Sequence, residues 1–214
     1  MAAAPEKLAA LRHLLAERFP TAPRRAGRVW PTRIPAVDEA TGGLPLGAIT
    51  EIVCAAPSCG SQLLLAQLLA GTRRERQRAA LIDAADAFDP ASHPADLLTH
   101  LLWVRCPGTT VALQATDLLA RDANLSLVVL DLRHAPATEL RRIPGPQWYR
   151  LQRAAEPADL ALVILTPRPS VPSAQVRFTL ATPHMPLALA QERHALVAHL
   201  PVTLQRQRLQ AAAS

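Results

Sequence analysis

The chain has 214 residues, half of them apolar, and carries a formal net charge of +6. This length suits one α/β domain with a short extension. No apolar run approaches the roughly 18–20 residues of a membrane span, and Glu6 and Glu17 argue against a signal peptide. Three cysteines without C-x-x-C spacing indicate reduced thiols rather than disulfides or zinc ligands. We therefore expect a cytoplasmic protein with no metal site and no membrane partner.

The positive charge is almost entirely arginine, because Lys7 is the only lysine of the chain. This charge is compatible with a nucleic acid or an acidic partner. Solubility and codon bias explain it equally well, so both alternatives stay open.

Three regions are predicted in chain order. Leucines at helical spacing predict an amphipathic helix within residues 1–19. Residues 20–33 are rich in proline and arginine and are typical of a linker. Residues 34–214 form the predicted core domain. The N-terminal helix either binds a partner or packs on its own core.

Within the core, apolar strands alternate with helices. The predicted strands cover residues 48–53, 79–84, 101–104, 125–132 and 160–167. The predicted helices cover residues 61–78, 109–123 and 145–156, and another begins at residue 94. This alternation indicates an α/β fold with a mainly parallel sheet and helices on both faces. Residues 173–181 and 196–209 are predicted as strands that extend the sheet without intervening helices, as an antiparallel C-terminal extension.

The stretch EIVCAAPSCGSQLLLAQLLA, residues 51–70, has the pattern of a phosphate-binding loop between a strand and a helix. Gly60 stands where such a loop needs glycine. Ser61 takes the place of the lysine that would reach the phosphates, and Gln62 that of the Ser/Thr that would hold magnesium. We expect no nearby side chain to replace the lysine. Backbone amides alone then predict weak anion affinity and no hydrolysis.

The order of several segments resembles the RecA core. IPAVDEATGGLPLGAITEI precedes the loop, ALIDAADAFDP follows at residues 80–90, and LSLVVLDL ends near Asp131. The resemblance covers roughly residues 34–210 and implies a RecA-like P-loop core. It places Asp131 at the magnesium-associated aspartate, Ala85 at the catalytic glutamate and Thr166 at the γ-phosphate-sensing glutamine. The segment RPSVPS replaces the DNA-binding loop that would follow.

By this resemblance, three catalytic residues of the RecA pattern are replaced: the lysine by Ser61, the glutamate by Ala85 and the glutamine by Thr166. The resemblance implies a degenerate core that is not an enzyme and uses no cofactor. Its vestigial nucleotide loop comprises Gly60, Ser61, Gln62 and Asp131.

A narrower resemblance joins the chain to the ImuA family, through WYRLQRAAEPADLALVILTPRPSVPSAQVRFTL at residues 148–180. It implies a non-catalytic accessory role in SOS-induced translesion DNA synthesis, a DNA-repair and mutagenesis pathway. The implied partners are ImuB and an error-prone polymerase complex, with RecA and single-stranded DNA as further candidates. Two alternatives remain: an ATP-dependent RecA-family DNA-binding ATPase and a SulA-like cell-division inhibitor.

Two clusters of charged residues allow both a functional and a structural interpretation. Asp83, Asp86 and Asp89 follow a strand, where they would either hold magnesium or tether the loop and cap a helix. A second cluster mixes arginines with aromatic rings, which suits stacking of single-stranded DNA; alternatively its tryptophan is core and its arginines are surface charges. It comprises Arg141, Arg142, Trp148, Tyr149, Arg150 and Arg153.

Overall fold

The computed structural model describes residues 28–122 and 124–207. Within these residues the core is a seven-stranded sheet with the order β5-β4-β6-β7-β3-β8-β9. All neighbouring strands are parallel except β9, which runs antiparallel to β8. The strands are β3 (Ala48–Cys54), β4 (Arg78–Asp83), β5 (Leu101–Arg105), β6 (Leu125–Asp131), β7 (Ala161–Thr166), β8 (Val176–Leu180) and β9 (Val202–Gln207).

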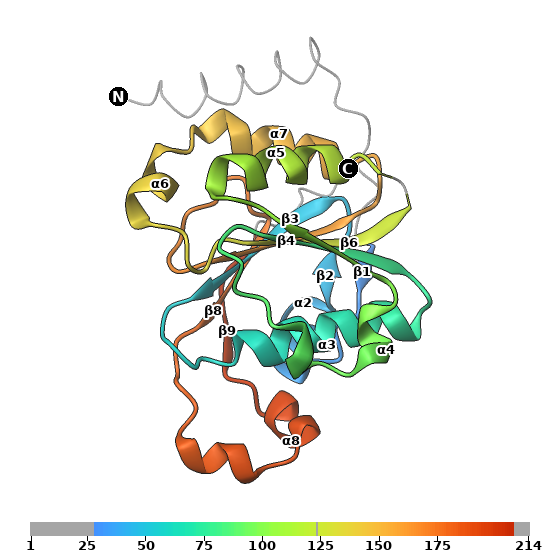
Figure 1. Cartoon of the computed structure of the whole chain (residues 1–214), viewed down its shortest axis with the longest axis vertical. Helices are drawn as coiled ribbons and strands as arrows, with labels where there is room; N and C mark the ends of the chain where they lie inside the picture. Colours follow the sequence, from blue (N-terminus) through green and yellow to red (C-terminus); the bar gives the residue numbers. More distant parts are fainter. Residues whose placement is uncertain (1–27, 123, 208–214) are drawn as a thin grey trace, which may run out of the picture. The chain divides into compact units, whose positions relative to one another are not determined.

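Helices cover both faces of the sheet (Figure 1). On one face lie α5 (Thr109–Leu119), α6 (Ala137–Arg142) and α7 (Gly145–Ala155). On the other lie α2 (Pro35–Thr41), α3 (Ser61–Arg74) and α4 (Ala95–Leu98). Each layer has its own buried apolar cluster against the sheet, as expected for strands that are apolar on both faces. The predicted α/β fold with a mainly parallel sheet is confirmed.

The compact unit begins before the position expected from the sequence. Residues 28–33 were predicted as part of a linker, but β1 (Val29–Trp30) pairs antiparallel with β2 (Leu44–Pro45). The Trp30 indole is buried on Gly71 of α3, where an added Cβ would lie 2.7 Å from the ring. Its Nε1 donates a hydrogen bond to Glu75. The predicted N-terminal helix and the rest of the linker lie outside the described residues.

The C-terminal extension differs in one respect from its prediction. Strand β8 adds parallel to β3, and β9 adds antiparallel to β8. Two short helices, η2 (Pro186–Ala190) and α8 (Arg193–Ala198), lie between them, although no intervening helix was expected. The predicted strand at 196–209 therefore begins too early, because its first residues end α8. These helices place the extension beside the loop after β3.

The chain after β7 crosses one face of the sheet to reach the start of β8, and a buried carboxylate on β3 anchors this crossover. Glu51, 0 % exposed, accepts hydrogen bonds from the backbone amides of Ser170 and Val171 at 2.6 and 3.1 Å. The Thr166 hydroxyl donates to the same oxygen at 3.0 Å, and Arg177 Nε donates to the other at 2.6 Å. This network satisfies a charge that would otherwise be costly to bury.

One further helix completes the described elements, the short 3₁₀ helix η1 (Pro90–Ser92). Among the described residues, no helix combines the length and apolar character that crossing a membrane requires.

Candidate functional site

The loop after β3 joins a parallel strand to a helix that begins after a glycine, the arrangement in which phosphate-binding loops occur. It runs from the end of β3 at Cys54 to the start of α3 at Ser61. Gly60 is the N-cap residue, in the left-handed conformation with φ 85°. A Cβ there would lie 2.4 Å from Leu200 Cδ1 and 2.8 Å from His184 Nε2. Both the backbone conformation and this close approach require glycine.

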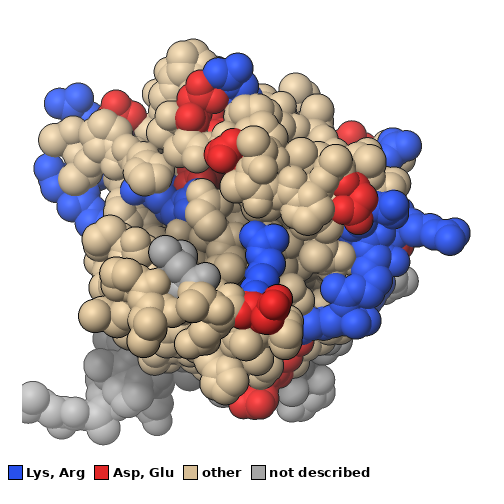
Figure 2. Space-filling view, turned by 60° about the horizontal axis from the view of Figure 1, so that its bottom comes forward, with Lys and Arg blue, Asp and Glu red and all other residues tan. Residues whose placement is uncertain are grey.

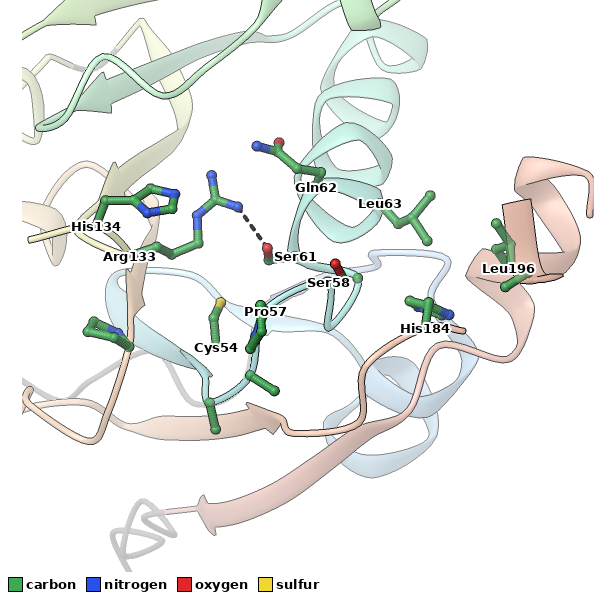
Figure 3. A pocket seen from close by; sticks show the side chains of 15 residues that line it. Cys54, Pro57, Ser58, Ser61, Gln62, Leu63, Arg133, His134, His184 and Leu196 are labelled. Atoms are coloured by element: carbon green, nitrogen blue, oxygen red, sulfur yellow. Dashed lines mark hydrogen bonds between the residues drawn. The ribbon is translucent and has the colours of Figure 1, made fainter. Parts of the chain in front are cut away.

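A pocket of about 700 Å³ opens over this loop (Figure 3). The loop and the first turn of α3 form its base, and the C-terminal extension supplies His184, Ala188 and Leu196. Arg133 and His134, which follow β6, approach from the opposite side. The pocket therefore lies at the carboxyl ends of parallel strands, where ligand sites of open α/β sheets occur.

An arginine from outside the loop reaches the position of the missing lysine. Arg133 Nη1 donates a hydrogen bond of 2.7 Å to Ser61 Oγ (Figure 3). Its Nε donates to Asp131 at 2.9 and 3.1 Å, and its Nη2 pairs with Asp131 Oδ2. The Arg133 and Asp131 side chains are only 6 % and 2 % exposed. A cation that the sequence analysis did not foresee therefore lies beside the lysine position, where it is paired with Asp131.

The charge of Arg133 is balanced inside the protein. Burial alone would lower the pKa of its guanidinium, but the hydrogen bond and charge of Asp131 outweigh burial, and the pKa is raised. The side chain therefore stays cationic and remains paired with Asp131. Ser61, Arg133 and Asp131 form one connected polar network that joins the loop to the end of β6.

Thr166, at the expected position of the γ-phosphate sensor, turns away from the pocket. Its side chain is fully buried, and its hydroxyl donates to Glu51 within the sheet. Gln62, by contrast, does line the pocket. Of the expected nucleotide-loop residues, the structure thus brings together Gly60, Ser61, Gln62 and, through Arg133, Asp131.

The aspartates after β4 have structural partners. Asp83, 1 % exposed, accepts hydrogen bonds from the amides of Ala85, Ala87 and Phe88 and so holds the loop that follows the strand. Asp89 caps η1 by accepting from the amide of Ala91. These contacts match the structural interpretation of the two residues.

Asp86 forms a two-pronged ion pair with Arg105, whose hydrogen bond lowers the pKa of the carboxyl group. Among the described residues, no three His, Cys, Asp or Glu side chains are grouped as a metal site would require.

The arginine–aromatic cluster divides between the core and the surface. Trp148 is 1 % exposed and lies with Leu151 on the buried face of α7. Its ring is therefore not available to stack on a base. The expectation of a base-stacking Trp148 is thus incorrect, because the apolar face of α7 is turned to the sheet. Arg150 pairs with Asp117 of α5 at 2.6 Å. This contact lowers the pKa of that carboxyl group.

Exposed members of the cluster remain candidates for binding. Arg141, Arg142, Arg153 and the 43 % exposed Tyr149 face solvent. Figure 2 shows basic side chains grouped mainly at the right and left edges of the face drawn, with single basic and acidic side chains scattered between them. The positive charge therefore does not coat this face evenly.

Comparisons with known proteins bear on the sequence relationship and on the fold. No family model matches the chain. The RecA proteins of Legionella pneumophila strains Corby and Lens are each 37 % identical to it over 115 residues, covering 52 % of this chain and 33 % of RecA. The chain thus matches about a third of the length of these curated relatives.

A solved structure extends the comparison to the fold. The RadB recombinase superposes with a TM-score of 0.56 and 16 % identity, over 71 % of this chain and 82 % of RadB. The fold is RecA-like, and about half of the chain shows sequence similarity to RecA.

Proposed function

We propose that this chain is a non-catalytic, RecA-like accessory protein of SOS-induced translesion DNA synthesis. In this role it is an adaptor between ImuB, with its error-prone polymerase, and RecA or DNA. The RecA similarity supports the general part of the proposal. The ImuA-like segment at residues 148–180 supports the pathway and the partners.

The observation that carries the non-catalytic part is the closed network of Ser61, Arg133 and Asp131. A working phosphate loop offers a free positive charge to the β- and γ-phosphates and an aspartate to the magnesium shell. Here Arg133 is neutralised by Asp131, and both oxygens of that carboxylate are occupied by the guanidinium. Separating a buried pair of this kind costs about 3–5 kcal/mol. These residues therefore do not fit magnesium–ATP.

A second candidate, an ATP-dependent RecA-family DNA-binding ATPase, is favoured by one observation. Arg133 is an arginine beside the lysine position, next to a pocket of about 700 Å³. This candidate requires an incoming phosphate to draw Arg133 away from Asp131. It also requires a water-activating group, and Ala85 supplies none at the expected position. We prefer the adaptor role for these reasons.

The adaptor role is tested by co-purification of the full chain with ImuB, and in parallel with a tubulin-like cell-division protein. We expect retention of ImuB and none of the division protein. Retention of the division protein without ImuB would overturn the proposal in favour of a cell-division inhibitor. A control for nonspecific electrostatic capture reverses the charge of Arg74. This residue is exposed at the end of α3 and is not among the candidate binding residues of α6 and α7.

A further inference from the structure

Two cavities meet where α6 is followed by α7, at one end of the helical layer over the sheet (Figure 1). The larger, of about 490 Å³, opens between α5 and this junction. The smaller, of about 310 Å³, opens between the junction and the segment after β7. Ile143, which directly follows α6, lines both cavities, so together they form one groove, the α6–α7 groove. It shares no lining residue with the pocket over the loop after β3.

Guanidinium groups lie on both sides of Ile143. Arg142 lines the larger cavity, and Arg141 and Arg168 line the smaller one. In the described part of the chain, the side chains of Arg141 and Arg142 have no hydrogen-bond or ion-pair partner, and that of Arg168 donates only to the Ala137 carbonyl. None of these three positive charges is therefore paired with a carboxylate among the described residues.

The same groove contains one carboxylate, and it is already engaged. Glu139 lines the larger cavity, and its Oε2 accepts a hydrogen bond of 2.6 Å from the Thr109 hydroxyl. With three guanidinium groups and one carboxylate, the lining of the groove has an excess of positive charge. An anionic group is therefore the complementary occupant.

The lining favours an acidic peptide over single-stranded DNA. Its one aromatic ring, Trp148, is 1 % exposed, so neither cavity offers a ring on which a base would stack. The charge of Glu139 repels a phosphate, whereas its second oxygen suits a peptide N–H. Gln114 and Gln147 line the larger cavity without a hydrogen-bond partner among the described residues. Each of these amides offers a donor and an acceptor, as a peptide backbone requires.

We propose that the α6–α7 groove binds an acidic segment of a partner protein, with one carboxylate at Arg142 and a second at Arg141 and Arg168. The amides of Gln114 and Gln147 contact the main chain of this segment. The inference rests on the adaptor role proposed above and assigns a surface to it. Arg141 and Arg142 are also candidates for contact with DNA, so single-stranded DNA is the competing occupant.

The probes are overlapping synthetic peptides that cover ImuB and RecA, the partners proposed above, and the binder is the full native chain. Fluorescence anisotropy measures the affinity of each labelled peptide. We expect binding by peptides with two or more closely spaced Asp or Glu residues. Replacing those residues with Asn and Gln should weaken it about tenfold or more, because each contact is a hydrogen bond between charged groups. Equal affinity of the acidic and the neutral versions would overturn the proposal, as would the absence of binding by every acidic peptide.

A pair of double variants separates the groove from general charge attraction. Arg141→Gln with Arg142→Gln removes one cation from each cavity and should weaken the tightest acidic peptide about tenfold or more. Arg74→Gln with Arg76→Gln removes the same charge from exposed positions at the end of α3 and in the turn after it. This control should change the affinity less than about twofold. Equal losses in the two double variants would contradict a site in the groove.

An uncharged substitution gives a second readout. Gln147→Leu leaves the net charge unchanged, so charge attraction alone predicts no effect. Because the change removes a hydrogen-bonding amide from the larger cavity, we expect an affinity loss of about three- to tenfold, with the same dependence on salt concentration. An unchanged affinity would show that the cavity does not contact the peptide.

Two further measurements identify the occupant and keep the adaptor role separate. A labelled thymidine oligonucleotide that binds more tightly than every acidic peptide would identify the occupant as nucleic acid and overturn the proposal. Co-purification is repeated with the double variant Arg141→Gln, Arg142→Gln, and we expect it to retain less ImuB or less RecA than the native chain. If the native chain and this variant retain both partners equally, the groove is not the docking surface, while the adaptor role stands.

Discussion

At the scale of single residues, Arg133 explains how a phosphate loop persists without its lysine. The helix N-terminus at Ser61 and the buried carboxylate of Asp131 face the same edge of the sheet. A cation between the Ser61 hydroxyl and Asp131 bonds both of these groups, and Arg133 reaches this position from the end of β6. The protein's own arginine thus joins the loop to the buried carboxylate.

The coupling of Arg133 with Asp131 can be measured by a double-mutant cycle. The single change Arg133→Met leaves a buried carboxylate without a partner and should lower the free energy of unfolding by about 3–5 kcal/mol. Adding Asp131→Leu should restore most of this loss, because an apolar pair needs no charge compensation. The measurement is urea unfolding, with the exposed Arg153→Ala as a control expected to change stability by less than about 0.5 kcal/mol. Additive losses in the double variant would contradict the network.

The Cys59 thiolate predicts a titration near pH 6. Its pKa is lowered to about 6 by the Cys54 thiol and by the amides of Ser61 and Ala56. Because the charged form appears as pH rises, the ultraviolet absorbance of thiolate should increase through this range. Cys59→Ser should abolish the increase. Cys106→Ser should leave it unchanged, since burial raises the pKa of Cys106. A first transition only above the ordinary thiol pKa would contradict the assignment.

At the scale of elements, the segment after β7 has a structural role, because it connects β7 to β8 and is bonded to Glu51. In the RecA resemblance a DNA-binding loop is expected there, whereas here the chain crosses the sheet and is tied to Glu51. Glu51→Gln keeps the side-chain size but turns one acceptor into a donor facing Arg177. We expect stability to fall by about 1.5–3 kcal/mol, the contribution of a hydrogen bond to a charged group.

Hydrogen exchange locates this effect of Glu51→Gln. The Ser170 and Val171 amides should exchange faster, since the crossover is held less firmly. The Phe88 amide, bound to Asp83, should keep its protection and serves as an internal control. Unchanged exchange at Ser170 and Val171 would show that the negative charge of Glu51 is not what holds the crossover, since the oxygen kept in glutamine still accepts from both amides.

The helices α6 and α7 carry the remaining candidates for nucleic-acid contact. Replacing Arg141, Arg142 and Arg153 together with alanine should weaken single-stranded DNA binding. It should also reduce the slope of log affinity against log salt by about 0.7 for each phosphate that these arginines neutralise. The matched control replaces Arg74, Arg76 and Arg78, which lie at the end of α3, in the turn after it and at the start of β4. Fluorescence anisotropy at several salt concentrations measures both, and equal effects of the two triple substitutions would indicate nonspecific charge attraction alone.

The pattern of elements could be predicted because it depends on local features. Alternating apolar strands and amphipathic helices gave the α/β class, and the small-residue loop before a leucine-rich helix located the site. The short helices α2 and α6 were not predicted, since each spans barely two turns and carries little apolar periodicity. The early start of the core at Trp30 was also missed, because its burial depends on Gly71, far along the sequence.

At the scale of the whole molecule, the site residues that were missed depend on strand order. Arg133 follows β6, which is separated from β3 by β7, so only the assembled sheet brings it to Ser61. Its position two residues after Asp131 was a usable signal, because the carboxyl ends of parallel strands meet at one edge. Similarly, His184 covers Gly60 only because the extension between β8 and β9 folds back over the loop.

The fold is compatible with the proposed role, in which a RecA-like scaffold does not hydrolyse ATP. Two of the three positions at which the RecA resemblance expects a catalytic group have internal partners: Ser61 bonds Arg133, and Thr166 bonds Glu51. Such contacts stabilise the scaffold without a ligand. We infer that surfaces outside the pocket carry the adaptor role.

The most direct test of this account is a titration of labelled magnesium–ATP into the purified full chain, with a RecA-type ATPase as the positive control. Because Arg133 is committed to Asp131, we predict no saturable binding up to millimolar nucleotide and no release of phosphate. Saturable binding at micromolar ATP would contradict the account, and its loss in Arg133→Met would identify Arg133 as the substitute for the lysine.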